Sequence, residues 1–208
     1  MGKVGSKLLF EAVELFSGLP GIGKKSALRM ALHVAAQDPS KTKKLSDLLS
    51  KITTELKVCK HCFLYADSDI CDICASPARD TKTLCIVESI KDVLAIEETS
   101  QYNGKYHILG ALISPIDGIG PDSLNLNSLA DRIVSNGVTE LIMAIRPSIE
   151  GDTTIYYISK LLTGQNVKIS MIARGVSFGS ELEFTDEITL GRSILSRTPY
   201  LIHENQLV

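Results

Sequence analysis

The first part of the chain repeats apolar residues with the period of an α-helix. Apolar side chains recur every three or four positions from Leu8 to Phe16, which predicts an amphipathic helix that ends at Ser17-Gly18. The same spacing predicts a second helix with Met30 and Val34 on its apolar face, and a third from about Lys44 to Leu56. The chain is therefore expected to be helical throughout this part.

The second half has a different pattern, in which short continuous apolar runs alternate with helical segments. Such runs are typical of strands buried on both faces of a parallel sheet. The expected strands cover 83–87, 106–109, 141–145 and 167–172, and the expected helices cover 91–98, 129–135 and 154–162. This alternation predicts a mainly parallel sheet with helices on both sides. An extended stretch at 181–184 and a helix from 185 to 196, capped by Thr185 or Asp186, are expected to follow.

Between these two parts lie two Cys-x-x-Cys pairs, Cys59/Cys62 and Cys71/Cys74, with eight residues between them. Thiolates at this spacing can surround one tetrahedral Zn²⁺, and a site with four protein ligands is structural rather than catalytic. His61 could compete as a ligand, but four sulfurs suffice. Two disulfides or four buried free thiols are the alternatives. Disulfides need an oxidising compartment, and the N-terminus has no signal-peptide pattern.

Composition narrows the function only slightly. The 208 residues are 44% hydrophobic and 22% charged, and the formal net charge is −2. These values are typical of a globular protein, and no apolar stretch approaches the length that a membrane-spanning helix needs. Because the chain as a whole is nearly neutral, any binding to nucleic acid must depend on local clusters of positive charge.

A glycine-containing turn joins the first two predicted helices. Gly21 and Gly23 allow the backbone to turn sharply and a partner to approach it closely, while the N-terminus of the next helix offers unpaired N–H groups. Lys25 and Arg29 lie four positions apart on that helix, so they project toward the same anion. Lys24 is a weaker candidate. The turn is therefore expected to bind phosphate.

The pattern Leu-Pro-Gly-Ile-Gly-x-x-x-Ala in this turn resembles the helix-hairpin-helix motif of DNA repair proteins, which binds the DNA backbone without reading its sequence. A nucleotide-binding P-loop is one alternative, but a helix rather than a strand precedes the turn. A purely structural turn is another. Nearby, Lys41, Lys43 and Lys44 either form a solvated face or add a DNA contact.

Carboxylates follow two of the predicted strands. Glu88 comes directly after the strand 83–87, and Glu150 and Asp152 come after the strand 141–145. Ligands gather beyond the carboxyl ends of parallel strands, so these acids could converge on Mg²⁺. The arrangement resembles the Toprim domain of primases and topoisomerases, but Glu150 replaces the first aspartate of its Asp-x-Asp motif, which weakens the case for catalysis. Alternatively, Asp152 caps the following helix.

These motifs occur in one order, followed by the segments 172–176 and 187–192. The ordered set resembles the RecR family of bacterial recombination proteins over nearly the full chain. The fold expected is α+β and multidomain. Its parts are a helical helix-hairpin-helix region (1–56), a small four-cysteine zinc finger (57–79), an α/β Toprim domain with a mainly parallel sheet (80–174), and a helical or extended C-terminal region (175–208).

The resemblance implies more about function than the residues predict by themselves. RecR proteins are DNA-repair mediators rather than enzymes, and with RecO and RecF they help load RecA onto single-stranded DNA coated by SSB at gaps. The family implies a homotetramer or dimer, sequence-independent binding to single-strand/duplex junctions, no membrane, and a cytoplasmic, nucleoid-associated location. Glu88, Glu150 and Asp152 would then serve a partner interface. The alternative is a Mg²⁺-dependent Toprim nuclease or nucleotidyl transferase.

Overall fold

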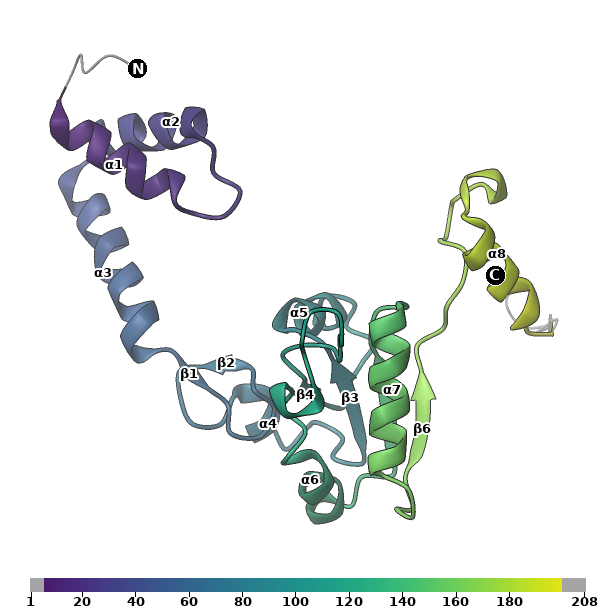
Figure 1. The fold of residues 1–208 in the computed structure, drawn as a ribbon. Helices are drawn as coiled ribbons and strands as arrows, with labels where there is room; N and C mark the ends of the chain where they lie inside the picture. Colours follow the sequence, from purple (N-terminus) through teal and green to yellow (C-terminus); the bar gives the residue numbers. More distant parts are fainter. Residues whose placement is uncertain (1–5, 200–208) are drawn as a thin grey trace, which may run out of the picture. The chain divides into compact units, whose positions relative to one another are not determined.

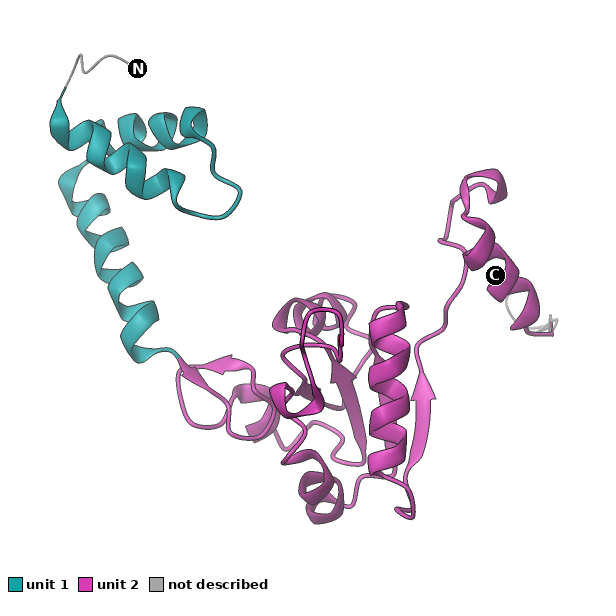
Figure 2. Ribbon diagram, in the orientation of Figure 1, with its two compact units in different colours: residues 1–56 teal, residues 57–208 magenta. Residues whose placement is uncertain are grey.

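The computed structural model describes residues 6–199 of the chain. The chain divides into two compact units, residues 1–56 and residues 57–208 (Figure 2). The first and last predicted domains extend into residues 1–5 and 200–208, which lie outside the described residues. The boundaries of the four predicted domains stay a prediction.

Three helices make up the first unit: α1 (Lys7–Ser17), α2 (Lys24–Ala35) and α3 (Pro39–Glu55) (Figure 1). α1 packs against α2, whose buried residues are Ala27 and Ala31. Small side chains at a helix contact let the two backbones come close. All three predicted helices are therefore present, and α1 and α2 lie where the apolar spacing predicts them.

The start of α3 differs from the prediction, because the helix begins at Pro39 rather than near Lys44. Asp38 is its N-cap, and its carboxylate accepts a hydrogen bond from the Ser40 N–H at 2.8 Å. Proline is favoured in the first turn of a helix, since its missing N–H has no partner there in any case. Asp38 and Pro39 lie outside the apolar face of the helix, so the spacing of apolar residues alone does not predict where α3 begins.

The second unit begins with the small cysteine finger, which contains β1 (Lys57–Val58), β2 (Tyr65–Ala66) and α4 (Asp72–Ala75). β1 and β2 pair antiparallel. A four-stranded sheet follows, in the order β4-β3-β5-β6. Its strands are β3 (Thr83–Val87), β4 (Lys105–Ile108), β5 (Glu140–Ala144) and β6 (Lys168–Met171). All its neighbouring strands pair in parallel, as predicted.

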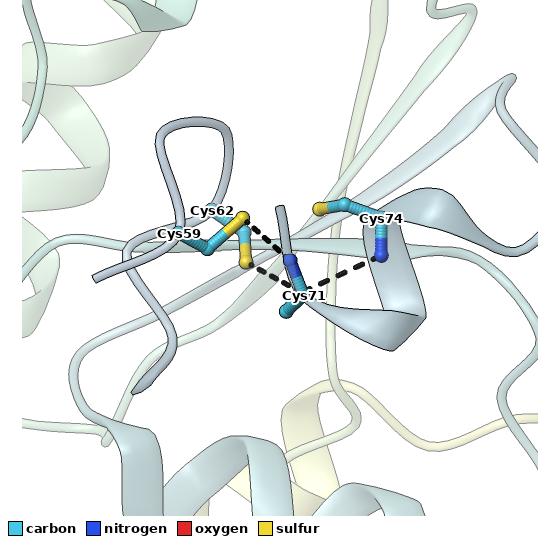
Figure 3. A group of neighbouring side chains, drawn as sticks. All are labelled: Cys59, Cys62, Cys71 and Cys74. Carbon is cyan, nitrogen blue, oxygen red and sulfur yellow. Dashed lines mark hydrogen bonds between the residues drawn. The ribbon is translucent and has the colours of Figure 1, made fainter. Parts of the chain in front are cut away.

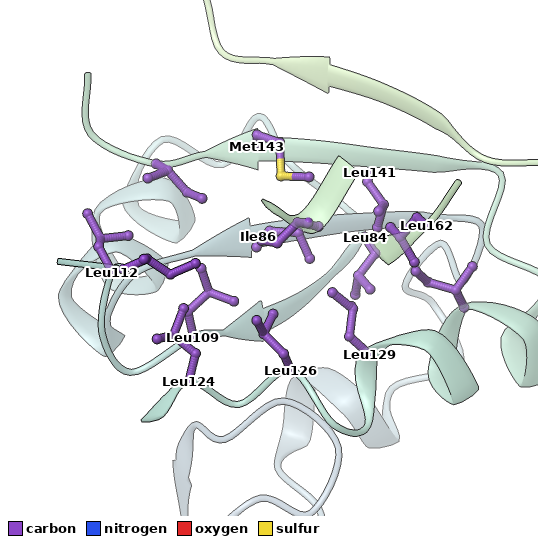
Figure 4. Packing of buried hydrophobic residues seen from close by; sticks show 14 of the residues in the cluster. Leu84, Ile86, Leu109, Leu112, Leu124, Leu126, Leu129, Leu141, Met143 and Leu162 are labelled. Carbon is purple, nitrogen blue, oxygen red and sulfur yellow. The ribbon is translucent and has the colours of Figure 1, made fainter. Parts of the chain in front are cut away.

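Helices cover both faces of this sheet. They are α5 (Ile90–Glu98), α6 (Leu129–Asn136) and α7 (Ile149–Leu161), with α7 in front of the sheet in Figure 1. Leu84 and Ile86 of β3 pack with residues of α6 and α7 in the larger hydrophobic cluster (Figure 4). Cys85 and Val87 pack with Val93 of α5 in the smaller one. Successive strand residues point to opposite faces, so the two clusters lie on opposite sides of the sheet.

The C-terminal part of the second unit is short and largely exposed. A 3₁₀ turn, η2 (Leu182–Phe184), replaces the predicted extended stretch, so that prediction is wrong. α8 (Glu187–Leu195) follows, and its cap is Asp186, whose carboxylate accepts a hydrogen bond from the Thr189 N–H at 2.8 Å. None of the helices between residues 6 and 199 combines the length and the apolar character needed to cross a membrane.

Candidate DNA interface, zinc centre and acidic edge

The turn between α1 and α2 presents backbone N–H groups and positive charge together. Gly21 has φ +78°, a conformation that side chains with a Cβ rarely adopt. Gly23 is the N-cap of α2, and no side chain caps this end of the helix. The first N–H groups of α2 are thus left for a ligand, as at other anion-binding helix N-termini.

The space around Gly23 is open. Its φ is −80°, and a Cβ added there would meet no atom within 4 Å. Neither backbone conformation nor internal packing therefore requires glycine at this position. Glycine is a favourable N-cap, and without a side chain it also lets a ligand approach the backbone closely.

Lys24, Lys25 and Arg29 are all exposed on α2. Within residues 6–199 none of the three forms an ion pair. Their charges are therefore not neutralised by the unit itself. The turn and these three cations form the surface that the sequence predicts for DNA.

The four cysteines come together, as the zinc prediction requires. Their sulfurs lie within 4.8 Å of one another, and all four residues are buried (Figure 3). Backbone N–H groups face the sulfurs: Cys71 N donates to Cys59 Sγ and Cys74 N to Cys71 Sγ, each at 3.4 Å. Four buried, mutually close sulfurs with amide donors are the ligand set of a closed, structural zinc site.

The electrostatics of the cluster favour a thiolate at Cys74. A hydrogen bond from Cys62 lowers the pKa of Cys74 to about 5, and the positive charge of Arg132 contributes to the same shift. The pKa of Cys62 is raised, because Cys62 keeps the proton that it shares with Cys74. Zinc binds thiolates, so loading the site releases the protons that remain. The four cysteines would hold Zn²⁺, which would cross-link the two Cys-x-x-Cys knuckles.

The acidic residues behave differently, because arginines neutralise two of them. Arg146 Nε lies 3.1 Å from Glu88 Oε2. Arg174 Nη2 lies 2.6 Å from Asp152 Oδ1, a contact between α7 and the segment after β6. The hydrogen bond from Arg174 holds the pKa of Asp152 below its ordinary value. No local sequence pattern predicts that Arg146 and Arg174 pair with these acids, and the sequence analysis did not identify them.

The start of α7 explains why the three acids do not converge. The helix begins at Ile149 rather than Thr154, because Ser148 is its N-cap and accepts a hydrogen bond from Gly151 N at 3.1 Å. The interpretation of Asp152 as the cap is therefore wrong. Glu150 and Asp152 lie in the first turn of the helix, two positions apart, and such residues do not face each other.

The cysteines are the only group of three or more histidine, cysteine or acidic residues in the described part of the chain that could hold one metal ion. The acidic edge thus lacks the shared geometry on which the magnesium prediction depends. Glu88 instead follows the end of β3, and Glu150 and Asp152 lie in the first turn of the helix after β5; the three residues are called the acidic edge here.

Asp152→Asn is expected to loosen the C-terminal region, because it removes the charge that holds Arg174 and, at 3.9 Å, Arg192. Limited proteolysis of the segment 175–199 should become roughly severalfold faster. Because the pKa of Asp152 is lowered, its pairing is present at neutral pH and is lost only as the pH falls through that lowered value.

Glu150→Gln is the matched control for this experiment. Glu150 lies in the same helical turn and forms no ion pair within residues 6–199. Equal protection of the segment in both variants and in the unchanged protein would show that Asp152 does not anchor it.

Four consecutive stretches match known family descriptions. Residues 9–53 match the helix-hairpin-helix region of RecR, 56–76 match its four-cysteine zinc finger domain, 82–173 match the Toprim domain, and 175–198 match the RecR C-terminal region. The structure places the glycine turn, the four cysteines and the parallel sheet within the first three of these matches. The family match and the close packing of the four sulfurs thus agree that this segment is a four-cysteine zinc finger.

Full-length relatives agree with these matches. A protein of Phocaeicola vulgatus named "Recombination protein RecR" is 50% identical over 193 residues, 93% of this chain and 94% of the relative. Proteins of the same name from Amoebophilus asiaticus (50% identical, 94% and 98% covered) and Cytophaga hutchinsonii (48% identical, 96% and 98% covered) are similar to it as well. The chain therefore belongs to the RecR family of recombination proteins.

Proposed function

We propose that this chain is a DNA-binding mediator of recombinational repair that carries out no covalent chemistry of its own. With RecO- and RecF-type partners it helps load RecA onto SSB-coated single-stranded DNA at gaps. The observation that carries the proposal is the α1–α2 turn, where Lys24, Lys25 and Arg29 surround an uncapped helix N-terminus. Backbone N–H groups at a helix N-terminus together with lysine and arginine side chains suit phosphate oxygens, which carry no sequence information.

The acidic edge serves as a protein interface in this proposal. Glu88 and Asp152 are paired with arginines rather than arranged around a metal ion. Next to Glu150, the side chain of Ile149 is 84% exposed. An exposed apolar residue beside a carboxylate that has no ion pair within residues 6–199 suits a partner with basic and apolar side chains, since it combines an apolar anchor with a charge that fixes orientation.

Self-association is supported by the uncovered face of α3. The apolar residues that define this face are 45–56% exposed in the first unit: Leu45, Leu48, Leu49 and Ile52. A helix stabilises a protein mainly by burying such a stripe. We assign the stripe to contacts between copies of the chain in a dimer or tetramer. Several weak DNA-binding turns then act together by avidity.

Leu48→Asp combined with Ile52→Asp is expected to lower the mass of the assembly, because it places two charges in an apolar contact. Light scattering after size-exclusion chromatography measures that mass directly. Ser50→Asp with Thr54→Asp adds the same charges on the polar side of α3 and should leave the mass unchanged. An unchanged mass for the first pair would remove α3 from the interface.

The loading step tests the proposed function itself. RecA-dependent ATP hydrolysis on SSB-coated gapped DNA should start after a shorter lag when the chain and its partners are present. A Lys25→Ala/Arg29→Ala protein should fail to shorten the lag, since both changes remove α2 cations and lie outside α3 and the acidic edge. Loading that is equally fast with this variant would contradict the role given to the α2 cations.

A further inference from the structure

Arg132 is a charged residue in the interior of the second unit. It lies on α6 between apolar residues that face the core, and it is only 8% exposed. Burying a guanidinium costs free energy unless its N–H groups are hydrogen-bonded and its charge is balanced. The contacts of this side chain therefore have to explain why it is there.

Its hydrogen bonds join two parts of the unit. Arg132 Nη1 donates to the carbonyl oxygen of His61, in the finger, at 2.8 Å. The same nitrogen donates to the carbonyl oxygen of Tyr106, in β4, at 2.6 Å. Nη2 points at Cys74 Sγ, 3.8 Å away. One guanidinium thus holds the first cysteine knuckle, the edge strand of the sheet and a zinc ligand.

The positive charge of Arg132 lacks a carboxylate partner among residues 6–199. His107 does not supply a negative charge either. Its Nε2 donates to the Asn125 carbonyl at 2.5 Å, so its Nδ1, 3.3 Å from Arg132 Nη1, is free to accept. Burial lowers the pKa of His107 to about 4, which keeps the ring neutral. The thiolates of the finger are the anions that remain.

A zinc ion with four thiolates carries excess negative charge, which a buried site must balance. Lys105 adds a second cation at the same end of the finger, where its Nζ donates to the Cys74 carbonyl at 2.9 Å. That contact is with a dipole, whereas the contact of Arg132 is with the sulfur itself. Arg132 is therefore the group placed to offset the charge of the centre.

The finger also covers the open edge of the sheet. β4 is an outer strand, and its Ile108 N–H donates to the Cys62 carbonyl at 3.0 Å. Phe63, which follows Cys62 with φ +66°, packs edge-on against the His107 ring at 5.4 Å between centroids. The knuckle that zinc holds in shape thus satisfies an edge N–H that would otherwise be left unpaired.

We propose that Arg132 is a positioning residue that provides the counter-charge of the zinc–thiolate centre and makes zinc loading and the ordering of β4 one cooperative event. The finger is then a folded extension of the Toprim sheet rather than an independent module. Loss of the metal then also disorders β4, because the hydrogen bonds of Arg132 to His61 and Tyr106 and the Ile108–Cys62 hydrogen bond join the finger to this strand.

Zinc release from the full-length protein to a chromophoric chelator tests the first part. Arg132→Gln should release zinc about 10-fold to 100-fold faster, the range typical of lost contacts to metal ligands. Arg132→Lys keeps the positive charge but loses the planar guanidinium with its several N–H donors, so its zinc-release rate should lie between those of Arg132→Gln and the unchanged protein. Lys60→Gln is the matched control, since Lys60 is an exposed finger cation paired with Asp69 at 2.5 Å. Equal release rates for Arg132→Gln and the unchanged protein would overturn the proposal.

Hydrogen exchange of the unchanged protein tests the second part and needs no variant. After chelation the Ile108 amide and its neighbours in β4 should exchange much faster, while the amides of β5 should change little. The same protection of Ile108 with and without zinc would overturn the coupling. If Arg132→Gln does not fold, this measurement and the Arg132→Lys release rate decide the proposal.

Discussion

Replacing Lys25 and Arg29 together with alanine is expected to weaken binding to all DNA sequences alike. Both side chains are exposed on α2, whose N-terminus has no side-chain cap, and in the proposed function they contact phosphates rather than base edges. Each removed phosphate contact releases one counterion fewer, so the slope of log affinity against log salt should fall by about one per cation. At low salt the affinity should fall by about tenfold or more.

Fluorescence anisotropy with several labelled gapped DNAs, at a series of salt concentrations, gives both quantities. Lys41→Ala with Lys43→Ala removes the same charge from the start of α3 and is the matched control. We expect that control to bind nearly as well as the unchanged protein. A loss that differed between DNA sequences would contradict backbone binding, and an equal loss in the control would move the contact to α3.

Replacing Cys59 and Cys62 together with serine is expected to abolish zinc binding and strongly destabilise the second unit. The two residues are buried and supply half of the sulfur cluster. Apparent zinc-binding free energies of about 10–16 kcal/mol in zinc-finger peptides contribute directly to folding. Losing even part of that should lower the melting temperature by about 10 °C or more. The exposed edge of β4 should also promote aggregation.

Elemental analysis and thermal unfolding measure these two effects. The unchanged protein should contain one zinc ion per chain, and the variant none. Cys85→Ser is the control, because Cys85 is a buried cysteine of the smaller cluster that takes no part in the metal site. It should destabilise the protein without removing zinc. A zinc-free protein of unchanged stability would show that the cysteines are ordinary core residues.

The fold could be predicted where the information is local. β3 runs from Thr83 to Val87, as its continuous apolar run predicts. The cysteine cluster is also predictable, because the spacing of two Cys-x-x-Cys pairs is a local pattern typical of zinc sites, and the four sulfurs do lie together. By contrast, the starts of α3 and α7 are set by the caps Asp38 and Ser148, which precede the apolar periodicity. A search for caps would have found both.

The acidic edge could not be predicted to the same extent, because its electrostatics depend on contacts between distant residues. Arg174 reaches Asp152 from the segment after β6, and Arg132 reaches Cys74 from α6. Periodicity places an arginine on the buried side of a helix but does not name its partner.

The uncovered face of α3 is a further case, since apolar spacing predicts burial without saying which chain supplies the other side.

A denaturing gel tests the central claim, a DNA-binding mediator without chemistry, most directly. Labelled gapped DNA is incubated with the protein in Mg²⁺ or Mn²⁺, beside a Glu88→Gln lane, after native electrophoresis has shown that the DNA is bound. The account predicts bound DNA that stays intact in every lane. New cleavage or joining products that disappear in the Glu88→Gln lane would make the acidic edge a catalytic site and contradict the account.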